Sequence, residues 1–334
     1  MAMRPQQRRL LGLLALLVVL AVVCLASLAL GSRFIPFDVQ WSALTTHLDT
    51  PDAIVVRSLR VPRTLLGVLV GLALGAAGAL IQGHTRNPLA DPGLLGVTQG
   101  AALAVVIAVV TLGINTLYGF IWFAFAGALI ASVTVYVLGG VGGNAVTPVT
   151  LALAGAVVSA LLGGLVSAIV LLDGRGMEVF RFWRVGSIAA RDYSVVWQTA
   201  PFLLAGLVLA VACAPGLNLL ALGDDVAAAL GHRIRRTRVL GVVTVTLLAG
   251  AAVAASGPIA FVGLVVPHLA RMIAGPDYRW LVPFAALLGA DVLLVADILG
   301  RVLSGDAFDV GIMLALVGAP VFIALVRRKA LVRL

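Results

Sequence analysis

Ten separate apolar segments run through this chain of 334 residues, and each is near the length that a helix needs to cross a bilayer. This pattern predicts an all-α membrane protein that forms a single polytopic membrane domain over residues 1–334. So many spans leave almost no sequence for a separate soluble catalytic domain. The predicted spans cover approximately residues 10–31, 64–82, 94–112, 117–138, 149–172, 194–214, 238–255, 258–274, 280–302 and 310–327.

Composition excludes a soluble protein of this size. Hydrophobic residues make up 62% of the chain and charged residues only 11%, whereas a soluble domain carries about 25% charged residues. The net charge of +9 does not indicate a nucleic-acid partner, because the arginines lie in short segments between apolar blocks, where topology explains them. Cys24 and Cys213 lie in separate apolar segments and indicate neither a disulfide nor a metal site.

The distribution of basic residues predicts an orientation in the membrane. An even number of spans places both termini on one side. If that side is the cytoplasm, fourteen of the 23 basic residues fall in inside segments. This excess predicts that both termini are cytoplasmic. The apolar run after Arg8 and Arg9 is longer than the core of a secretory signal, so we expect it to be a retained span.

Small residues recur at spacings of three or four in two spans, which places each set along one helix face. The sets are Gly67, Gly71, Gly75 and Gly78 in the second span, and Gly155, Ser159, Gly163 and Ser167 in the fifth. Small side chains let helix backbones approach closely, so we expect tight packing for the second span. For the fifth span, a face that lines a conduit is an equal alternative.

The longest inside loop, residues 215–237, contains a short predicted helix. Two acidic residues favour its start and a glycine favours its end, while two apolar residues share one face. These residues are, with the preceding glycine, Gly223, Asp224, Asp225, Val226, Leu230 and Gly231. Such a helix suits docking into the groove of another protein. Arg233, Arg235 and Arg236 equally support the alternative, a loop that lies on lipid headgroups.

Ionisable residues inside the predicted spans are candidates for function, because a charge at the bilayer centre costs about 2.5–3.5 kcal/mol. Asp291 and Asp297 lie in the ninth span, and Asp297 can pair with Arg301 four residues later. Structural pairing is the favoured interpretation for Asp297, whereas Asp291 has no local partner. A proton relay through Asp291 or Asp297 would instead make the chain a proton-coupled secondary transporter. His268 has no histidine or cysteine at metal-ligand spacing.

Longer motifs are distributed from about residue 57 to the end of the chain. They include RVPRT at 60–64, GAAG at 75–78, RNPLADPGLLG at 86–96, LGDDV at 222–226, GPIAFVGL at 257–264 and GAPVF at 318–322. Together these motifs resemble the FecCD-type permeases, the membrane subunits of ABC importers for ferric siderophores, haem and cobalamin. The resemblance implies the type II importer permease fold, with ten transmembrane helices per subunit, in the bacterial cytoplasmic (inner) membrane.

The resemblance also implies partners. A second permease subunit, either a copy or a related chain, would complete a central pathway. Two ABC ATPase subunits would bind ATP and Mg, and an extracytoplasmic substrate-binding protein would deliver the ligand. The segment 223–231 corresponds to the coupling helices that sit in a cleft of the ATPase, which favours the docking interpretation of the loop.

Individual residues receive roles from the same resemblance. Arg60, Arg63 and Arg301 are implied to meet acidic residues of the binding protein. The pathway is implied to follow the fifth and tenth spans to an inner gate. The residues assigned to pathway and gate are Thr147, Pro148, Val149, Thr150, Gly155, Ser159 and Gly163. The positions that form the structural part of the motifs are Asn87, Pro88, Pro267, His268 and Asp297.

The chain lacks the sequence of a nucleotide-hydrolysing site. A P-loop needs a lysine within a GxxxxGK[ST] run, and the only lysine is Lys329, between Arg328 and Ala330. We therefore predict a transport subunit that is not an enzyme and binds no cofactor itself. ATP hydrolysis on partner subunits would drive the import of a bulky metal chelate. An iron siderophore is the first expectation, and haem or cobalamin the second.

Overall fold

A computed structural model gives the fold of the chain and describes residues 5–31, 33–46, 50–114, 116–140, 147–304 and 308–327. Within these ranges every regular element is a helix. Seven of the described helices are long and apolar enough to cross a membrane, and three shorter helices are also apolar. The expectation of an all-α membrane protein is confirmed. Each of the ten predicted spans overlaps one of these helices, while the membrane boundaries themselves stay a prediction.

The helices follow one another along the chain with short connections. In the first half they are α1 (Pro5–Ala29), α2 (Phe37–Thr45), α3 (Pro51–Ile54), η1 (Val55–Arg60), α4 (Val61–Thr85), η2 (Pro92–Leu95), α5 (Val97–Leu112), α6 (Leu117–Gly139) and α7 (Pro148–Leu172). In the second half they are α8 (Gly174–Val185), α9 (Tyr193–Ala221), α10 (Asp224–Ala229), α11 (Ile234–Ser256), α12 (Val262–Ala274), α13 (Tyr278–Ser304) and α14 (Val310–Arg327).

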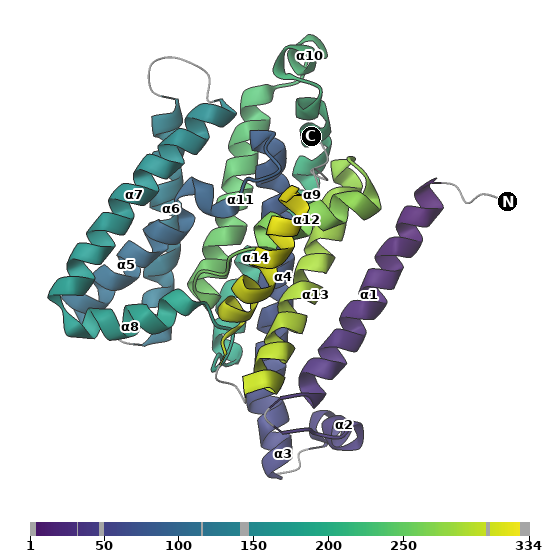
Figure 1. Cartoon of the computed structure of the whole chain (residues 1–334), viewed down its shortest axis with the longest axis vertical. Coiled ribbons are helices and arrows are strands. Elements are labelled where there is room, and N and C mark those ends of the chain that lie inside the picture. Colours follow the sequence, from purple (N-terminus) through teal and green to yellow (C-terminus); the bar gives the residue numbers. More distant parts are fainter. Residues whose placement is uncertain are drawn as a thin grey trace.

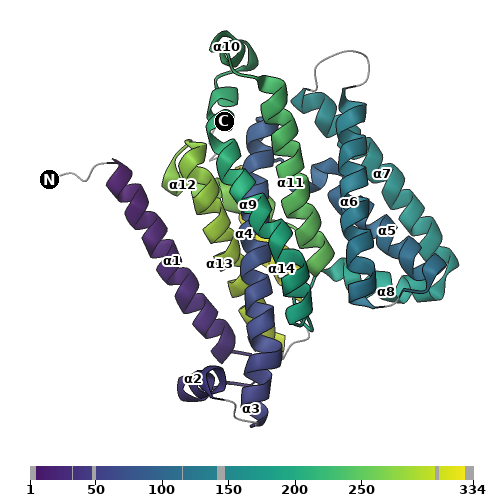
Figure 2. The same ribbon diagram turned by 180° about the vertical axis from the view of Figure 1, so that it is seen from behind.

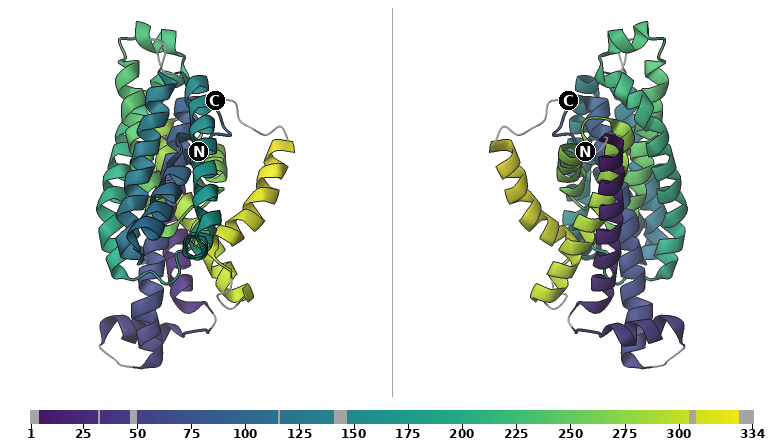
Figure 3. Two further views of the ribbon diagram at one scale, coloured as in Figure 1. Left: turned by 90° about the vertical axis from the view of Figure 1, so that its left-hand side faces the viewer. Right: turned by 90° about the vertical axis from the view of Figure 1, so that its right-hand side faces the viewer.

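Helix α4 runs through the centre of the bundle and packs against α13, α9, α11 and α12 (Figures 1 and 2). Helix α1 lies at one edge, and α5, α6 and α7 form the opposite edge. The short α10 projects from one end of the bundle, while α2, α3 and α8 lie toward the other end. Helix α14 leans away from the bundle along its length (Figure 3). Helix α1 begins, and α14 ends, toward the end that carries α10.

Two helix boundaries differ from the sequence-based expectation for physical reasons. Helix α9 does not stop near residue 214 but continues through Pro215 to Ala221, because Leu217 and Leu220 pack into the core. The predicted loop 215–237 therefore has helical ends. Helix α12 begins at Val262, four residues later than expected, because the backbone of Gly257 and Phe261 takes positive φ angles of 72° and 68°, which no helix contains.

The small-residue face of α4 brings backbones into direct contact, as expected for close packing. A Cβ added at Gly75 would lie 2.0 Å from the carbonyl oxygen of Ala285 in α13. One added at Gly78 would lie 2.1 Å from the carbonyl oxygen of Gly263 in α12. Any larger side chain at these positions would force α4 away from its neighbours.

We predict that Gly75→Ala destabilises the folded chain by about 1–3 kcal/mol, the usual cost of overpacking. The matched control is Gly164→Ala in α7, where an added Cβ meets nothing within 4 Å. The control is expected to be neutral or stabilising by about 0.5–1 kcal/mol, because alanine favours a helix over glycine. Thermal unfolding of the two purified variants in the same detergent measures the difference. Equal midpoints would contradict the packing argument.

Candidate functional site

The projecting helix α10 and the residues that flank it carry an exposed apolar surface. The side chains of Leu222, Val226 and Leu230 are 58%, 49% and 63% exposed, whereas Ala227 on the inner face is fully buried. The flanking glycines make the two turns possible, because Gly223 and Gly231 have φ angles of 106° and 77° that favour glycine. The structure thus presents a small apolar tip at the end of the bundle, at the position where the sequence predicts a docking helix.

A three-residue ion network fastens α10 to the bundle. One carboxylate oxygen of Asp224 accepts a hydrogen bond from Arg86, and the other lies 2.5 Å from Nη2 of Arg238. Arg86 directly follows α4 in a left-handed conformation with φ 47°, and Arg238 lies in the first turns of α11 with its side chain only 10% exposed. Asp224 therefore links α10 to two long helices. Asp225 is exposed instead.

The sequence analysis did not identify Arg86 and Arg238 as functional residues. Arg86 and Asp224 are 138 residues apart in the chain, so no local spacing connects them. The available signal was that Arg86, a residue other than glycine, follows a predicted helix beside a motif with two prolines. Such a signal is too general to predict the pair with Asp224. The sequence analysis treated the two aspartates of the loop as one charged unit, whereas the structure places them in different environments.

A second ion network lies at the end of the bundle opposite α10. Asp297 accepts hydrogen bonds from Nε and Nη2 of Arg63 at 3.0 and 2.8 Å, and its other carboxylate oxygen lies 3.1 Å from Nη2 of Arg301. The expected pairing of Asp297 with Arg301 is present. Asp297 is 1% exposed, so its charge is balanced by two cations inside the protein.

Arg60 and Arg301, which the sequence predicts as docking residues for a binding protein, are both buried in this structure. Arg60 is 6% and Arg301 is 2% exposed. Arg60 donates to the carbonyl oxygens of Leu28 and Ala29 at 2.6 and 2.8 Å, and Arg301 donates to that of Ser27 at 2.9 Å. These carbonyls belong to the last turn of α1, where they lack helical partners. Both arginines therefore cap α1, and Arg63 is bound to Asp297.

A polar cavity of about 530 Å³ lies between α5, α7 and α8 and reaches α14 at Gly311. Its walls include Gly163 and Ser167 of the small-residue face of α7, together with Arg184 of α8. Its polar lining also contains Asp91, Thr98 and Gln99. Burial raises the pKa of the Asp91 carboxyl, and a hydrogen bond from the amide of Gly93 opposes that shift.

The other residues assigned to pathway and gate lie elsewhere on α7. Gly155 is a packing residue, since an added Cβ would lie 1.7 Å from the carbonyl oxygen of Leu94 in η2. Ser159, one turn further along, is partly exposed. At the start of α7, on the side of α10, the side chains of Thr147 and Thr150 form a reciprocal capping box around Pro148 and Val149. The small-residue face thus combines packing near one end with cavity lining near the other.

The structural motif residues occupy turns and buried positions. The side chain of Asn87 accepts a hydrogen bond from the amide of Leu89 at 2.9 Å and shapes the turn around Pro88. Pro267 lies inside α12, where the neighbouring His268 is 2% exposed. Within the described residues, no group of three or more histidine, cysteine, aspartate and glutamate side chains could hold a metal ion.

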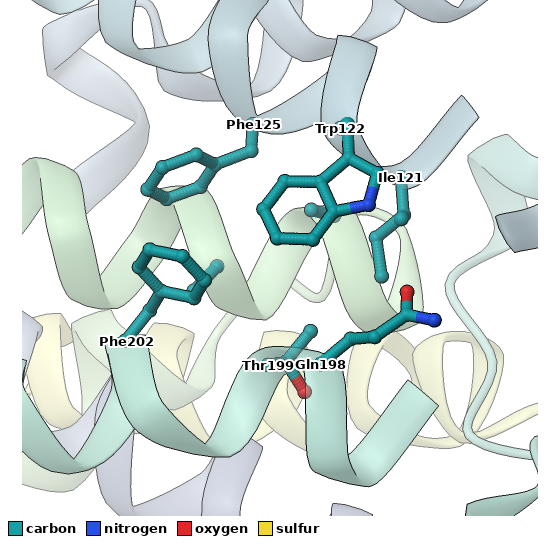
Figure 4. Close-up of a pocket in the computed structure, with 8 residues that line it drawn as sticks. Ile121, Trp122, Phe125, Gln198, Thr199 and Phe202 are labelled. Atoms are coloured by element: carbon teal, nitrogen blue, oxygen red, sulfur yellow. The ribbon is translucent and has the colours of Figure 1, made fainter. Parts of the chain in front are cut away.

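Two further cavities lie elsewhere in the bundle. Asp291 lines an apolar pocket of about 280 Å³ between α12, α13 and α14, and neither carboxylate oxygen has a hydrogen-bond partner among the described residues. Between α6 and α9, Trp122 and Phe125 surround Phe202 at ring distances of 5.8 and 5.0 Å (Figure 4). The gap beside these rings measures only about 10 Å³, so it holds at most one water and is a packing defect.

Comparisons with known proteins give one consistent result. The FecCD transport family matches residues 18–328. The ferric enterobactin transport system permease protein FepD of Escherichia coli (strain K12) is 44% identical over 319 residues, covering 95% of this chain and 94% of that protein. The hemin transport system permease protein HmuU of Yersinia pestis is 39% identical over 335 residues, covering 98% and 97%.

A solved structure gives the same result for the fold. This structure, an inward-facing conformation of a metal-chelate type ABC transporter, matches with a TM-score of 0.84 and 29% identity. The match covers 95% of this chain and 98% of that one. The type II importer permease fold that the sequence motifs predicted is confirmed.

We predict that Asp297→Asn lowers the stability of the folded chain by about 3–5 kcal/mol, because it leaves the buried Arg301 and the largely buried Arg63 without their counter-charge. The control is Asp38→Asn in α2, an exposed carboxylate whose loss is expected to cost below about 1 kcal/mol. Thermal unfolding in detergent measures both. A stable Asp297→Asn protein that has lost all transport would instead identify this carboxylate as a proton carrier.

Proposed function

Since this chain belongs to the FecCD transport family, we propose that it is the permease subunit of an ATP-driven importer for a ferric siderophore. The observation that carries the proposal is the exposed apolar tip of α10. Exposing Leu222, Val226 and Leu230 to water at the end of a membrane protein is unfavourable unless a partner covers them. A groove on an ATPase subunit, which would bind ATP and Mg, is the partner that such a short helix fits.

In this proposal Asp224 transmits movement between the ATPase and the membrane. A displacement of α10 would pull on Arg86 at the end of α4 and on Arg238 in α11 through charge-assisted hydrogen bonds. Such bonds are stronger than hydrogen bonds between neutral groups. Helix α4 packs against much of the bundle, so a shift of its end changes many helix contacts at once. Rigid helices moving as units are the usual way in which small shifts become large ones.

The polar cavity beside α7 is proposed as one wall of the substrate pathway. It lies at the edge formed by α5, α7 and α8 and reaches α14, so a second permease subunit across that edge would close it. The second subunit would be a copy of this chain or a related one. The bundle end that carries α10 would face the cytoplasm together with both chain termini. A substrate-binding protein would dock at the opposite end, on surfaces other than Arg60 and Arg301.

The substrate is proposed from the relatives and from the chemistry of the cavity. FepD is named for ferric enterobactin and is 44% identical to this chain over nearly its whole length. The cavity offers hydrogen-bonding groups and one arginine, Arg184, which suit an anionic metal chelate with many oxygen atoms. Haem is the second candidate, because HmuU is named for hemin and is 39% identical.

We predict that Leu230→Asp weakens the docking of the ATPase on the order of 30-fold, because it places a charge in the centre of an apolar contact. The variant would be co-expressed with its ATPase and reconstituted into vesicles. Co-purified ATPase and ATP-dependent uptake of a ferric siderophore should both fall. The control is Leu44→Asp in α2, a leucine at the other end of the bundle that is also more than half exposed.

Two results of this experiment would reject the proposal. One is an unchanged complex whose ATP hydrolysis still responds to substrate. The other is uptake by vesicles that contain this chain and an ion gradient but no nucleotide. The second result would support the proton-coupled alternative, for which Asp291 is the remaining carboxylate.

We predict that Asp224→Asn separates docking from transport. The apolar tip stays in place, so the ATPase should still bind, but the charged links to Arg86 and Arg238 become weak. The number of substrate molecules imported per ATP hydrolysed should fall at least fivefold, in line with a loss of about 1–2 kcal/mol in coupling. Asp225→Asn is the matched control, since that side chain is exposed. Equal coupling ratios for the two variants would show that the ion network has no transmitting role.

A further inference from the structure

Another pocket lies beside α10, at the base of the hairpin that α9 and α11 form. It measures about 420 Å³ and is bounded by the last turns of α9 and the first turns of α11. Figures 1 and 2 show these two helices side by side as they approach α10. The pocket has a polar part, with the charged side chains of Arg233 and Arg236 beside His232, and an apolar part that includes Ala212 and Leu240.

Helix geometry orders these two parts along the bundle axis. Residues spaced by three or four lie on one helix face, so Ala212 shares a face of α9 with Val208, which is 70% exposed. On α11, Arg236 shares a face with Leu240 and then with Val243, which is 50% exposed. The polar part therefore lies nearest α10, and the apolar part continues into valines that are at least half exposed. In a membrane protein such valines face lipid chains.

The pocket is built by specific contacts. Thr237 and Nε2 of His232 are hydrogen-bonded at 2.7 Å, which fixes the imidazole at the wall. A Cβ added at Gly216 of α9 would lie 2.8 Å from the methyl group of Thr237 and 3.5 Å from Nε2 of His232. Glycine at this position therefore lets α11 approach α9 without filling the space between them.

The charge of the pocket is not balanced by the protein. Its lining residues include two arginines and no carboxylate, and neither Arg233 nor Arg236 forms an ion pair within the described residues. The nearby Asp224 is already shared by Arg86 and Arg238. An anion from outside the chain is thus the missing partner. To match both parts of the pocket, this ligand needs an anionic group such as a phosphate at the polar part and an apolar tail along the apolar part.

We propose that this pocket binds one anionic phospholipid, with its phosphate between Arg233 and Arg236 and an acyl chain along Val208 and Val243. Basic pockets between transmembrane helices at a membrane surface are known to hold such headgroups. A surface of the ATPase is the less suitable occupant, because an aqueous protein would leave the apolar half of the pocket uncovered. The exposed tip of α10 points to a partner of its own and is formed by different residues.

Binding of fluorescent phosphatidylglycerol to the purified permease–ATPase complex in detergent tests the proposal. Arg233→Gln with Arg236→Gln should weaken binding on the order of 30-fold. The control, Arg235→Gln with Arg279→Gln, removes the same charge from exposed arginines outside the pocket and should retain the affinity. Filling the apolar part of the pocket with a bulky uncharged side chain gives a second measurement. Ala212→Phe should abolish binding, while its neighbour Val211→Phe, exposed but not in the pocket, should not.

Four outcomes would overturn the proposal. Equal losses in both double variants would mean general surface charge. Unchanged binding in Ala212→Phe would mean that the apolar half is not used. Inorganic phosphate could displace the fluorescent lipid as effectively as unlabelled phosphatidylglycerol diluted in phosphatidylcholine does. That result would mean a site for free phosphate. Loss of the ATPase from the Arg233→Gln, Arg236→Gln complex, with lipid binding intact, would assign the arginines to the protein partner.

Discussion

Backbone contact along the small-residue face of α4 is the constraint on which the rest of the structure depends. Inside a bilayer, lipid chains are as apolar as leucine, so helices associate through close packing instead of hydrophobic burial. Gly75 and Gly78 allow α4 to touch the backbones of α13 and α12. Helix α4 thereby becomes a rigid central element. Both ion networks start from its ends, at Arg63 on one side and Arg86 on the other.

The arginines of this chain serve helix ends as much as membrane topology. Arg60 and Arg301 bind the carbonyl groups of the last turn of α1, where the helix dipole is negative and the carbonyls have no helical donor. Such capping accounts for two of the arginines at the end opposite α10 without an external acidic partner. The same residues that mark a family motif can therefore be conformational supports of one helix.

The sequence predicted those features that depend on local patterns. Apolar length located the helices, the spacing of Gly67 to Gly78 predicted close packing, and the Asp-Asp-to-Gly pattern located α10. It did not predict the partners of Asp224 or the burial of Arg301, because those contacts join residues 138 and 274 positions apart. Helix ends were also displaced where proline or a positive φ angle intervened, as in α9 and α12. Tertiary contacts, which no short window contains, decided the partners of Asp224, the burial of Arg301 and the extension of α9.

The loop between α9 and α11 supported two equal interpretations from its sequence, a docking helix or a segment on lipid headgroups. The structure separates the residues that favoured each one. The apolar side chains and Asp224 belong to α10, whereas Arg233 and Arg236 border the pocket between α9 and α11. To transmit force from its tip, α10 needs a rigid connection to α9 and α11 as well as a contact surface. A lipid phosphate between the two arginines would hold the start of α11 at the membrane surface, so that force on α10 reaches α4 and α11 through Asp224 instead of bending the hairpin.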